Sequence, residues 1–303
     1  SEAVLPEGHQ SGFVAIVGRP NVGKSTLMNN ILQQKIAIVS PKAQTTRIKQ
    51  LGIVTEPDYQ AIFIDTPGIM KKALHRLDEV MLEAAVESLN DADVIVWLVD
   101  ASYPPTEEDE GIAEMVSAAR GKLLLAMNKN DLVPPDEVVD RTAAYRSLVP
   151  EETPWFFFSA DRNLGVDELY EAIIGGLPEG PRYYPADQIT DTFMRDIAAE
   201  MIREQLLLQI REEVPHGTAV EITSFKEDDE IIRINATIYV ERDSHKRIII
   251  GAGGKQIKKI GIDARQEIER LTGVQIHLEL WVKVAPKWRR KEKMIKRFGY
   301  IES

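Results

Sequence analysis

The chain has 303 residues, more than one ordinary hydrophobic core accommodates, so its length predicts two domains. Hydrophobic residues make up 44% and charged residues 28%, which is typical of a soluble globular protein. The longest wholly apolar run, residues 94–99, is far shorter than the roughly 18 residues needed to span a bilayer. Residues 1–11 do not resemble a secretory signal, and the absence of cysteine excludes disulfides, thiolate zinc sites and cysteine nucleophiles. We therefore expect a cytoplasmic protein.

The net charge of −11 is unevenly distributed along the chain. Residues 1–180 contain 15 Lys and Arg against 28 Asp and Glu, whereas the residues from Lys246 onward contain 15 against 6. Basic charge concentrated at the C-terminal end is typical of a module that binds polyanions. A solvated charged tail is the alternative interpretation.

A glycine-rich motif follows the first apolar run, residues 13–17, and precedes a helix-forming segment. A strand, a glycine turn and a helix in this order form a phosphate-binding loop, in which backbone N–H groups and the helix N-terminus surround the phosphates. We expect Lys24 to reach the β- and γ-phosphates and the Ser25 hydroxyl to ligate Mg²⁺. A plain glycine turn with an exposed lysine is the alternative. The residues of this cradle that are predicted to contact the nucleotide are Gly18, Arg19, Pro20, Asn21, Val22, Gly23, Lys24, Ser25 and Thr26.

Up to about residue 180, short strand-like runs alternate with amphipathic helical stretches. Four further runs, at 59–64, 94–99, 122–127 and 155–158, follow this pattern. The alternation predicts an α/β domain with a mostly parallel sheet, helices on both of its faces and ligands at the carboxyl ends of the strands. The remaining nucleotide motifs all lie at such ends.

Two motifs are predicted to hold the metal ion and the γ-phosphate. In the Asp-Thr-Pro-Gly turn at 65–68, Asp65 is placed to hold Mg²⁺ through its water shell, and the Gly68 N–H is placed to sense the γ-phosphate. In the polar loop that ends at residue 47, one threonine hydroxyl would complete the metal shell while the γ-phosphate is present. We favour Thr46 over Thr45 for this role.

Hydrolysis is expected to be slow. Many GTPases carry a glutamine directly after the Asp-x-x-Gly turn to orient the attacking water, and here that position is Ile69. The reaction would then depend on Lys24, Gly68, Mg²⁺ and the loop around Thr46. The side-chain carbonyl of Asn21 could hold a K⁺ ion beside the phosphates.

The sequence Asn-Lys-Asn-Asp at 128–131 is predicted to select the base. The Asp131 carboxylate can accept hydrogen bonds from N1–H and the N2 amine of guanine, whereas adenine offers no such pair of donors. Asn128 would tie this loop to the cradle, and the Lys129 stem would lie over the base.

Ser159 and Ala160 follow the last strand-like run, where the Ala160 N–H would face guanine O6. Five motifs in this order identify a guanine nucleotide-binding domain.

The rest of the chain predicts a smaller α+β module after a stiff, proline-rich linker. We expect a long helix from about Asp187 to Val214, strands over 219–225 and 231–240, two short helices, and a last strand over 274–284. Alternating apolar residues on the last two strands are predicted to face inward.

A glycine turn is predicted between the two short helices. We place the start of the first helix near Arg247 and that of the second at Gly254, with a break at Gly261. An Ile-Gly-x-x-Gly turn in this position is how KH domains clamp a single-stranded nucleic acid. Glycines let the nucleic acid backbone approach, and nearby lysines supply charge. The predicted contacts are Ile250, Gly251, Ala252, Gly253, Gly254, Lys255, Lys258 and Lys259. A glycine junction without a ligand is the alternative.

The C-terminal tail is strongly basic, with eight basic residues and one acidic residue over 283–297. Phosphate contacts with aromatic stacking suit single-stranded RNA, so we predict RNA contacts from Lys287, Trp288, Arg289 and Arg290. An amphipathic basic helix could equally contact anionic lipid or a partner protein.

Together these motifs resemble the bacterial Era GTPases, and the resemblance runs from about Gly12 to Tyr300. It rests on the cradle, the loop Lys-Ala-Gln-Thr-Thr-Arg, Asp-Thr-Pro-Gly, Asn-Lys-x-Asp, the linker Tyr-Tyr-Pro-x-Asp and Ile-Gly-x-x-Gly-x-x-Ile. It implies an α/β P-loop GTPase domain followed by an α+β type II KH domain, with GTP, GDP and Mg²⁺ as ligands. It also implies binding to single-stranded rRNA at the 3′ end of 16S rRNA, a role in maturation of the small ribosomal subunit, and occasional peripheral contact with the inner membrane.

We divide the chain into an N-terminal arm at 1–11, a GTP-binding domain at 12–177, a linker at 178–186, a KH-type RNA-binding domain at 187–285 and a basic tail at 286–303. We expect a monomer that acts as a switch, in which GTP orders the Thr46 loop and changes RNA affinity through the linker. Two other functions stay open: a GTPase whose tail docks on a membrane or a protein, and an ATP-using enzyme, which Asp131 disfavours.

Overall fold

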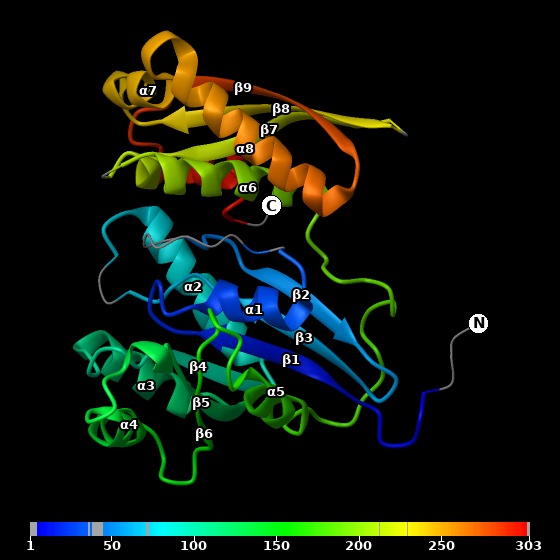
Figure 1. Cartoon of the computed structure of the whole chain (residues 1–303), viewed down its shortest axis with the longest axis vertical. Coiled ribbons are helices and arrows are strands. Elements are labelled where there is room, and N and C mark those ends of the chain that lie inside the picture. The colour runs from blue at the N-terminus through cyan, green and yellow to red at the C-terminus, as the bar shows by residue number, and fades with distance from the viewer. Residues whose placement is uncertain are drawn as a thin grey trace. The chain divides into compact units, whose positions relative to one another are not determined.

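The computed structural model describes residues 5–35, 37, 45–70, 73–211, 213–228 and 230–301. Most of the predicted loop before Thr46, and the first four residues of the predicted N-terminal arm, lie outside the described residues. The chain divides into two compact units, one formed mainly by residues up to Asp191 and one mainly by residues from Thr192 onward (Figure 1).

The first unit is built on a six-stranded sheet with the order β2-β3-β1-β4-β5-β6. Only β2 and β3 pair in antiparallel fashion, so the predicted mostly parallel sheet is confirmed. All residues of β4 are buried, as expected for a central strand covered on both faces. The strands are β1 (Gln10–Val17), β2 (Gln50–Thr55), β3 (Tyr59–Asp65), β4 (Val94–Asp100), β5 (Lys122–Asn128) and β6 (Trp155–Phe157).

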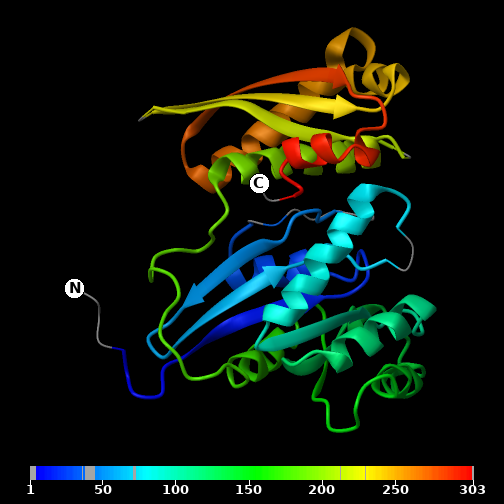
Figure 2. The same ribbon diagram turned by 180° about the vertical axis from the view of Figure 1, so that it is seen from behind.

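Helices cover both faces of this sheet because alternate residues of each strand point to opposite sides. Val14 and Ile16 share a core with residues of α1 (Lys24–Leu32) and α5 (Val166–Ile174). Ala15 and Val17 face the other core (Figures 1 and 2). The helices on that side are α2 (Arg76–Asp91), α3 (Glu107–Ala118) and α4 (Val138–Arg146).

The proline-rich segment is hydrogen-bonded to the sheet of the first unit. The fully buried Gln60 accepts hydrogen bonds at Oε1 from the N–H groups of Tyr183, at 2.7 Å, and Tyr184, at 3.0 Å. Its Nε2 donates to the Tyr184 carbonyl at 2.9 Å. On the edge strand β2, the Ile53 N–H donates to the Ile189 carbonyl at 2.6 Å. One buried amide therefore fixes three backbone groups of the segment.

The second unit has the predicted order of helix, strand, strand, helix, helix and strand. Its sheet has the order β7-β8-β9, with an antiparallel first pair and a parallel second pair. Inward residues of β8 and β9 pack in one core with α6, α7 and α8, as the alternation predicts. The elements are α6 (Met194–Gln209), β7 (Ala219–Glu227), β8 (Ile231–Val240), α7 (Asp243–Ile250), α8 (Lys255–Thr272) and β9 (Gln275–Val284), followed by the short α9 (Glu292–Arg297).

The helix predicted over 187–214 is shorter in the structure, where α6 spans Met194–Gln209. The Ile189 carbonyl instead accepts a hydrogen bond from the Ile53 N–H of β2, so a tertiary contact overrides the local helical pattern. At the other end, Ile210 has an extended conformation, which ends the helix before the 3₁₀ turn Pro215–Gly217.

The break predicted at Gly261 is wrong, because α8 continues through this residue. A Cβ at Gly261 would lie 3.4 Å from Leu280 Cδ1, an ordinary van der Waals contact, so this glycine marks neither a helix end nor a close approach. The first short helix also begins earlier than expected, at Asp243 rather than near Arg247.

Candidate functional site

The cradle and the base-selecting loop are joined by one side chain. Asn128 Nδ2 donates to the Val22 carbonyl at 2.8 Å, which confirms that Asn128 ties the two loops together. Gly23, which precedes α1, has a φ of 108°. A Cβ there would lie 2.3 Å from Asn128 Nδ2, so only glycine fits beneath this bond.

Lys24 lies in the cradle with its side chain folded along the loop. It is 6% exposed, and its Nζ donates to the Arg19 carbonyl at 2.7 Å and the Gly18 carbonyl at 3.3 Å. Burial, only partly opposed by the Asp65 carboxylate, lowers the pKa of Lys24 to about 8. A buried ammonium in this position is suited to bind the negative charge of a polyphosphate.

The three residues predicted to hold Mg²⁺ lie together. Ser25 Oγ donates to Asp65 Oδ2 at 2.7 Å and lies 3.0 Å from Thr46 Oγ1, which donates to the same carboxylate oxygen at 3.3 Å. Asp65 Oδ1 is buried with no hydrogen-bond partner among the described residues, and burial raises the pKa of this carboxyl. Two hydroxyls and a carboxylate are hard oxygen ligands, so this donor set fits Mg²⁺.

The turn after Asp65 lies against the cradle. A Cβ at Gly68 would lie 2.7 Å from the backbone nitrogen of Pro20, and the Ile69 N–H donates to the Gly18 carbonyl at 3.0 Å. The Ile69 side chain is buried in the core on the α2–α4 side of the sheet. It therefore does not supply a group that could orient water.

Lys129 and Ala160, both predicted to contact the base, have partners within the protein. Lys129 Nζ donates to Asp100 Oδ2 at 2.6 Å and to the Asn21 carbonyl at 2.9 Å. The Ala160 N–H donates to Asn128 Oδ1 at 2.8 Å, so guanine O6 would have to share or replace this bond. The contacts of both residues with guanine stay predictions.

Asp131 has a partner that the sequence analysis missed. Arg162 Nε lies 3.1 Å from Asp131 Oδ2, and the Arg162 N–H donates to Ser159 Oγ at 3.3 Å. Arg162 stands three residues after Ser159, and its position in that loop was the only available hint. The pair brings both base-selecting loops to one place.

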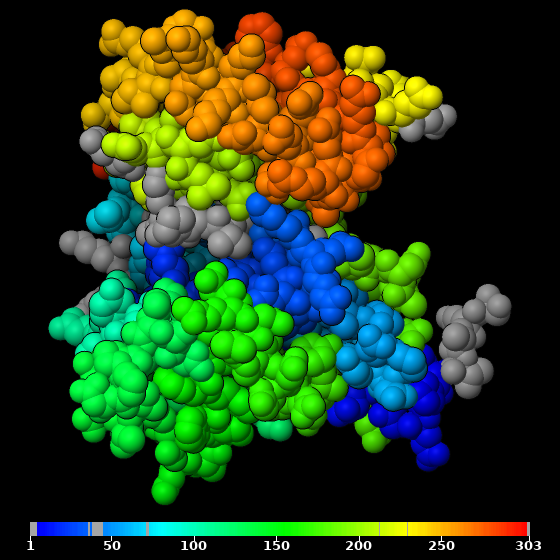
Figure 3. Space-filling model, in the orientation of Figure 1, coloured from blue at the N-terminus to red at the C-terminus, as the bar shows by residue number. Residues whose placement is uncertain are grey.

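The predicted Gly-x-x-Gly turn connects α7 and α8. Gly251, Gly253 and Gly254 have φ values of 72°, 59° and 76°, which L side chains rarely adopt. A Cβ on Gly253 or Gly254 would have no heavy atom of the described structure within 4 Å, so this backbone faces open space. Lys255, Lys258 and Lys259 are all exposed. The α7–α8 segment, orange in the space-filling view, lies at the surface (Figure 3).

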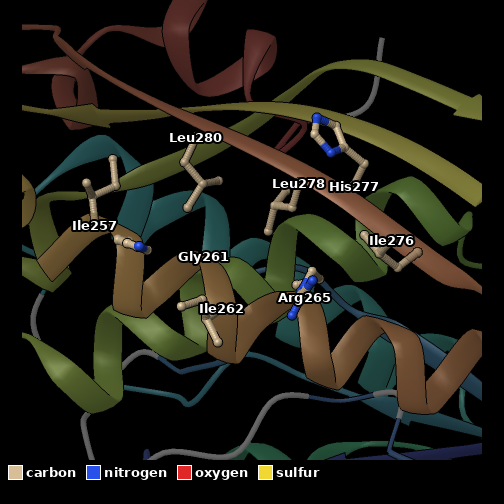
Figure 4. A pocket seen from close by; sticks show the side chains of 9 residues that line it. Ile257, Gly261, Ile262, Arg265, Ile276, His277, Leu278 and Leu280 are labelled. Carbon is tan, nitrogen blue, oxygen red and sulfur yellow. The ribbon is translucent and has the colours of Figure 1, made fainter. Parts of the chain in front are cut away.

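A groove between α8 and β9 continues from this turn. It has a volume of about 360 Å³, and Figure 4 shows Ile257, Leu278 and Leu280 directed into it. Lys258, Arg265 and His277 add polar groups to its lining. An apolar groove beside a glycine turn suits unstacked bases of a single strand. Sequence reasoning missed this groove, although the inward alternation of β9 indicated half of its lining.

The stacking role predicted for Trp288 is wrong. This side chain is 0% exposed, and its Nε1 donates to the Gly217 carbonyl at 2.8 Å. Its ring stacks on Tyr300, with centroids 5.9 Å apart, and meets Phe298 edge-on at 5.2 Å. Trp288 therefore anchors the C-terminal segment in the second unit and presents no face to RNA.

The other tail residues predicted to contact RNA differ in their surroundings. Arg289 Nη2 is paired with Glu241 Oε2 at 2.7 Å, whereas Lys287 and Arg290 are exposed. RNA contacts from this segment stay a prediction for Lys287 and Arg290.

Two family models match the chain. A 50S ribosome-binding GTPase family matches residues 13–129, and a KH domain family matches residues 213–289. The first range contains the cradle, and the second contains the glycine turn and the α8–β9 groove.

Relatives and solved structures match nearly the whole chain. The chain is 48% identical to GTPase Era of Halothermothrix orenii, over 96% of this chain and 99% of that protein. It is 46% identical to GTPase Era of Staphylococcus haemolyticus, over 97% and 98%.

Two solved structures match with a TM-score of 0.93 and 41% identity, over 97% of this chain and 100% of theirs. One is Era in complex with MgGDPNP and nucleotides 1506–1542 of 16S ribosomal RNA, and the other is a tyrosine-to-alanine variant of Aquifex aeolicus Era bound to GDP·AlF₄⁻. The chain therefore belongs to the Era family of GTPases.

Proposed function

We propose that this GTPase binds the 3′ end of 16S rRNA through its KH domain and assists assembly of the small ribosomal subunit. The observation that carries the proposal is the open glycine turn beside the apolar α8–β9 groove, in a chain whose fold matches Era in complex with nucleotides 1506–1542. About four nucleotides would be clamped there, with their backbone against the turn and their bases in the groove.

The nucleotide site supports GTP hydrolysis by positioning. Lys24 would bind the β- and γ-phosphates, while Ser25, Thr46 and Asp65 would hold Mg²⁺. When bound, Mg²⁺ neutralises charge on the phosphate oxygens. Because the buried Ile69 offers no polar group to the attacking water, we expect slow intrinsic turnover.

The glycine turn provides a direct test of RNA binding. Gly253→Asp introduces a carboxylate where a phosphate would approach, and Asp tolerates the left-handed backbone at this open position. We expect roughly a tenfold or greater loss of affinity for a synthetic RNA of nucleotides 1506–1542, with unchanged GTP turnover. Gly273→Asp is the matched control, because Gly273 has a φ of 70° and equally open surroundings at the other end of α8.

Unchanged RNA affinity in Gly253→Asp would contradict the proposal. If this variant still bound anionic vesicles or another protein through the basic C-terminal segment, the alternative docking function would be favoured. None of the described helices has the length and apolar composition to cross a membrane.

Coupling between the two sites would make the protein a switch. The hydrogen bonds that join Gln60 and Ile53 to residues 183–189 support this idea, because β2 directly follows the Thr46 loop. RNA affinity should therefore differ between complexes with a GTP analogue and with GDP. Equal affinities would remove the coupling.

Finer properties extend the same proposal. Asn21 would help hold K⁺ beside the phosphates, so replacing potassium with sodium should slow turnover. We further propose that the protein acts as a cytoplasmic monomer with peripheral contact at the inner membrane through its basic tail. Sedimentation and vesicle co-flotation of the full chain test these two properties.

A further inference from the structure

We infer that Arg19 serves GTP hydrolysis as a positioning residue, held by the buried carboxylate of Asp109 on α3, and does not itself contact the phosphates. Arg19 is the second residue of the cradle, where a cation could be taken for a phosphate ligand. Its Nε instead donates to Asp109 Oδ1 at 2.8 Å. The inference rests on the proposed placement of phosphates in the cradle.

Asp109 is a rigid anchor for this contact. Its side chain is 1% exposed, and its second oxygen, Oδ2, accepts hydrogen bonds from the Thr106 N–H at 2.9 Å and the Thr106 hydroxyl at 2.8 Å. Thr106 and Asp109 form the capping box that begins α3. One carboxylate thus fixes both the start of a helix and the guanidinium of the cradle.

Arg19 transmits this constraint to Lys24 through its backbone. The Arg19 carbonyl accepts the shorter of the two hydrogen bonds donated by Lys24 Nζ, at 2.7 Å against 3.3 Å for Gly18. If the Arg19 side chain loses its anchor, the carbonyl that orients the Lys24 ammonium can move. A misplacement of about 1 Å in a catalytic group can cost about a hundredfold in rate.

Because the ion pair is buried, Arg19 and Asp109 each depend on the other to balance their charge. Asp109 is fully buried and the Arg19 side chain is 19% exposed, so removing either partner leaves the other without its charge partner. Desolvation alone would lower the pKa of the Arg19 guanidinium, but hydrogen bonding and attraction to Asp109 outweigh it and raise this pKa. The Arg19 guanidinium therefore stays charged at neutral pH.

A double-mutant cycle of the full chain tests the inference. Arg19→Gln and Asp109→Asn should each lower kcat/KM for GTP about tenfold to a hundredfold, and the double variant should be no worse than the poorer single variant. Arg19→Lys should recover part of the loss, because it keeps the charge near Asp109. Asp109→Asn retains an oxygen for the capping box, which limits its effect on folding.

Thr106→Val is the matched control for helix capping. It removes the capping hydroxyl but keeps the Thr106 N–H on Asp109 Oδ2 and the carboxylate beside Arg19, so we expect a lower melting temperature with a much smaller loss of kcat/KM than in either variant of the pair. If Asp109→Asn behaved in the same way, the role of the pair would be structural and the inference would be overturned.

A direct phosphate contact gives a different pattern. If Arg19 acted as an arginine finger, Arg19→Gln would lower kcat by about a thousandfold or more while Asp109→Asn left kcat unchanged, which would overturn the inference. Lys24→Ala distinguishes a failure of this inference from a failure of the proposed phosphate site. Unchanged GDP affinity in Lys24→Ala would refute the phosphate site itself, whichever result the Arg19 variants give.

Discussion

The nucleotide site and the proposed RNA interface are built in opposite ways. At the nucleotide site, polar side chains from segments far apart in the sequence are hydrogen-bonded to one another, as in the pairs Ser25–Asp65 and Arg19–Asp109. At the proposed RNA interface, the turn 251–254 offers backbone in open space, with lysines nearby at the surface. Preorganised polar partners select one small molecule, whereas accessible backbone and charge suit a flexible polymer. If this contrast holds, substitutions at the two places should differ in the property that they change and in the size of the change.

The largest effect is expected at the residue that selects the base. Asp131→Asn should lower the affinity for GTP and GDP about a thousandfold, because its amide presents donors to the N1–H and N2 donors of guanine. Xanthosine nucleotides, which carry an oxygen at position 2, should then bind better than guanosine nucleotides. Titration with fluorescent nucleotides measures the affinities for guanosine and xanthosine nucleotides. The control is Asp140→Asn, which neutralises an exposed carboxylate on α4. Retained guanine preference would show that another group selects the base.

The buried tryptophan should have the next largest effect. Trp288→Ala removes a fully buried ring and its hydrogen bond to Gly217, so it should lower the free energy of unfolding of the second unit by about 3–5 kcal/mol. Trp281→Ala on β9 is the control, because that ring is 60% exposed and should have little effect on stability. Urea denaturation followed by circular dichroism distinguishes the two. A Trp288→Ala variant with normal stability and weak RNA binding would restore the stacking role.

A smaller effect is expected for the lysines of α8. If Lys255, Lys258 and Lys259 contact phosphates, each Ala substitution should reduce the slope of log affinity against log salt by about 0.7 and weaken RNA binding severalfold. Lys296→Ala, an exposed lysine on α9, should leave the slope unchanged. The opposite pattern would move the RNA interface to the C-terminal segment.

The smallest effect concerns acid stability where α9 meets the sheet. Burial of Glu221 favours its neutral form, but hydrogen bonds from Arg297 and Tyr239 outweigh this and hold the pKa of the carboxyl below its ordinary value of 4.5. A carboxyl whose pKa is lowered by folding stabilises the fold at pH values above its ordinary pKa. This stabilisation is lost as the pH falls through the pKa of the folded state.

Glu221→Gln should therefore lower the free energy of unfolding by less than about 1 kcal/mol at neutral pH, because Arg297 is half exposed, and should flatten the pH dependence below about pH 5. Denaturation series at several pH values, with the exposed Glu292→Gln as control, measure this difference. Identical pH profiles for Glu221→Gln and the unaltered chain would contradict the assigned role of the pair.

The sequence predicts a site well where its residues lie within one short motif at the end of a strand. The cradle, Asp65 and Asn128 could be assigned because each motif implies its own local turn and its place at the sheet edge. Asp109, the partner of Arg19, and Arg162, the partner of Asp131, could not be assigned, because α3 and the loop after Ser159 reach the site only through tertiary folding.

The same limit explains the errors in the second unit. Trp288 stands among basic residues and was therefore assigned to the surface, but its burial depends on Gly217, 71 positions earlier in the chain. The helix predicted from Asp187 has a local helical pattern, yet the backbone at Ile189 pairs with β2. In both cases a distant contact outweighs local preference.

The buried amide of Gln60 limits where a stable GTPase fragment can end. A fragment that stops at Leu177 would discard Tyr183 and Tyr184 and leave that amide with three broken hydrogen bonds. Each unsatisfied buried group costs about 1–3 kcal/mol, enough to threaten a domain of ordinary stability. A fragment that continues to Asp191 keeps every one of these bonds. Any separate GTPase fragment of the protein should therefore include the proline-rich segment.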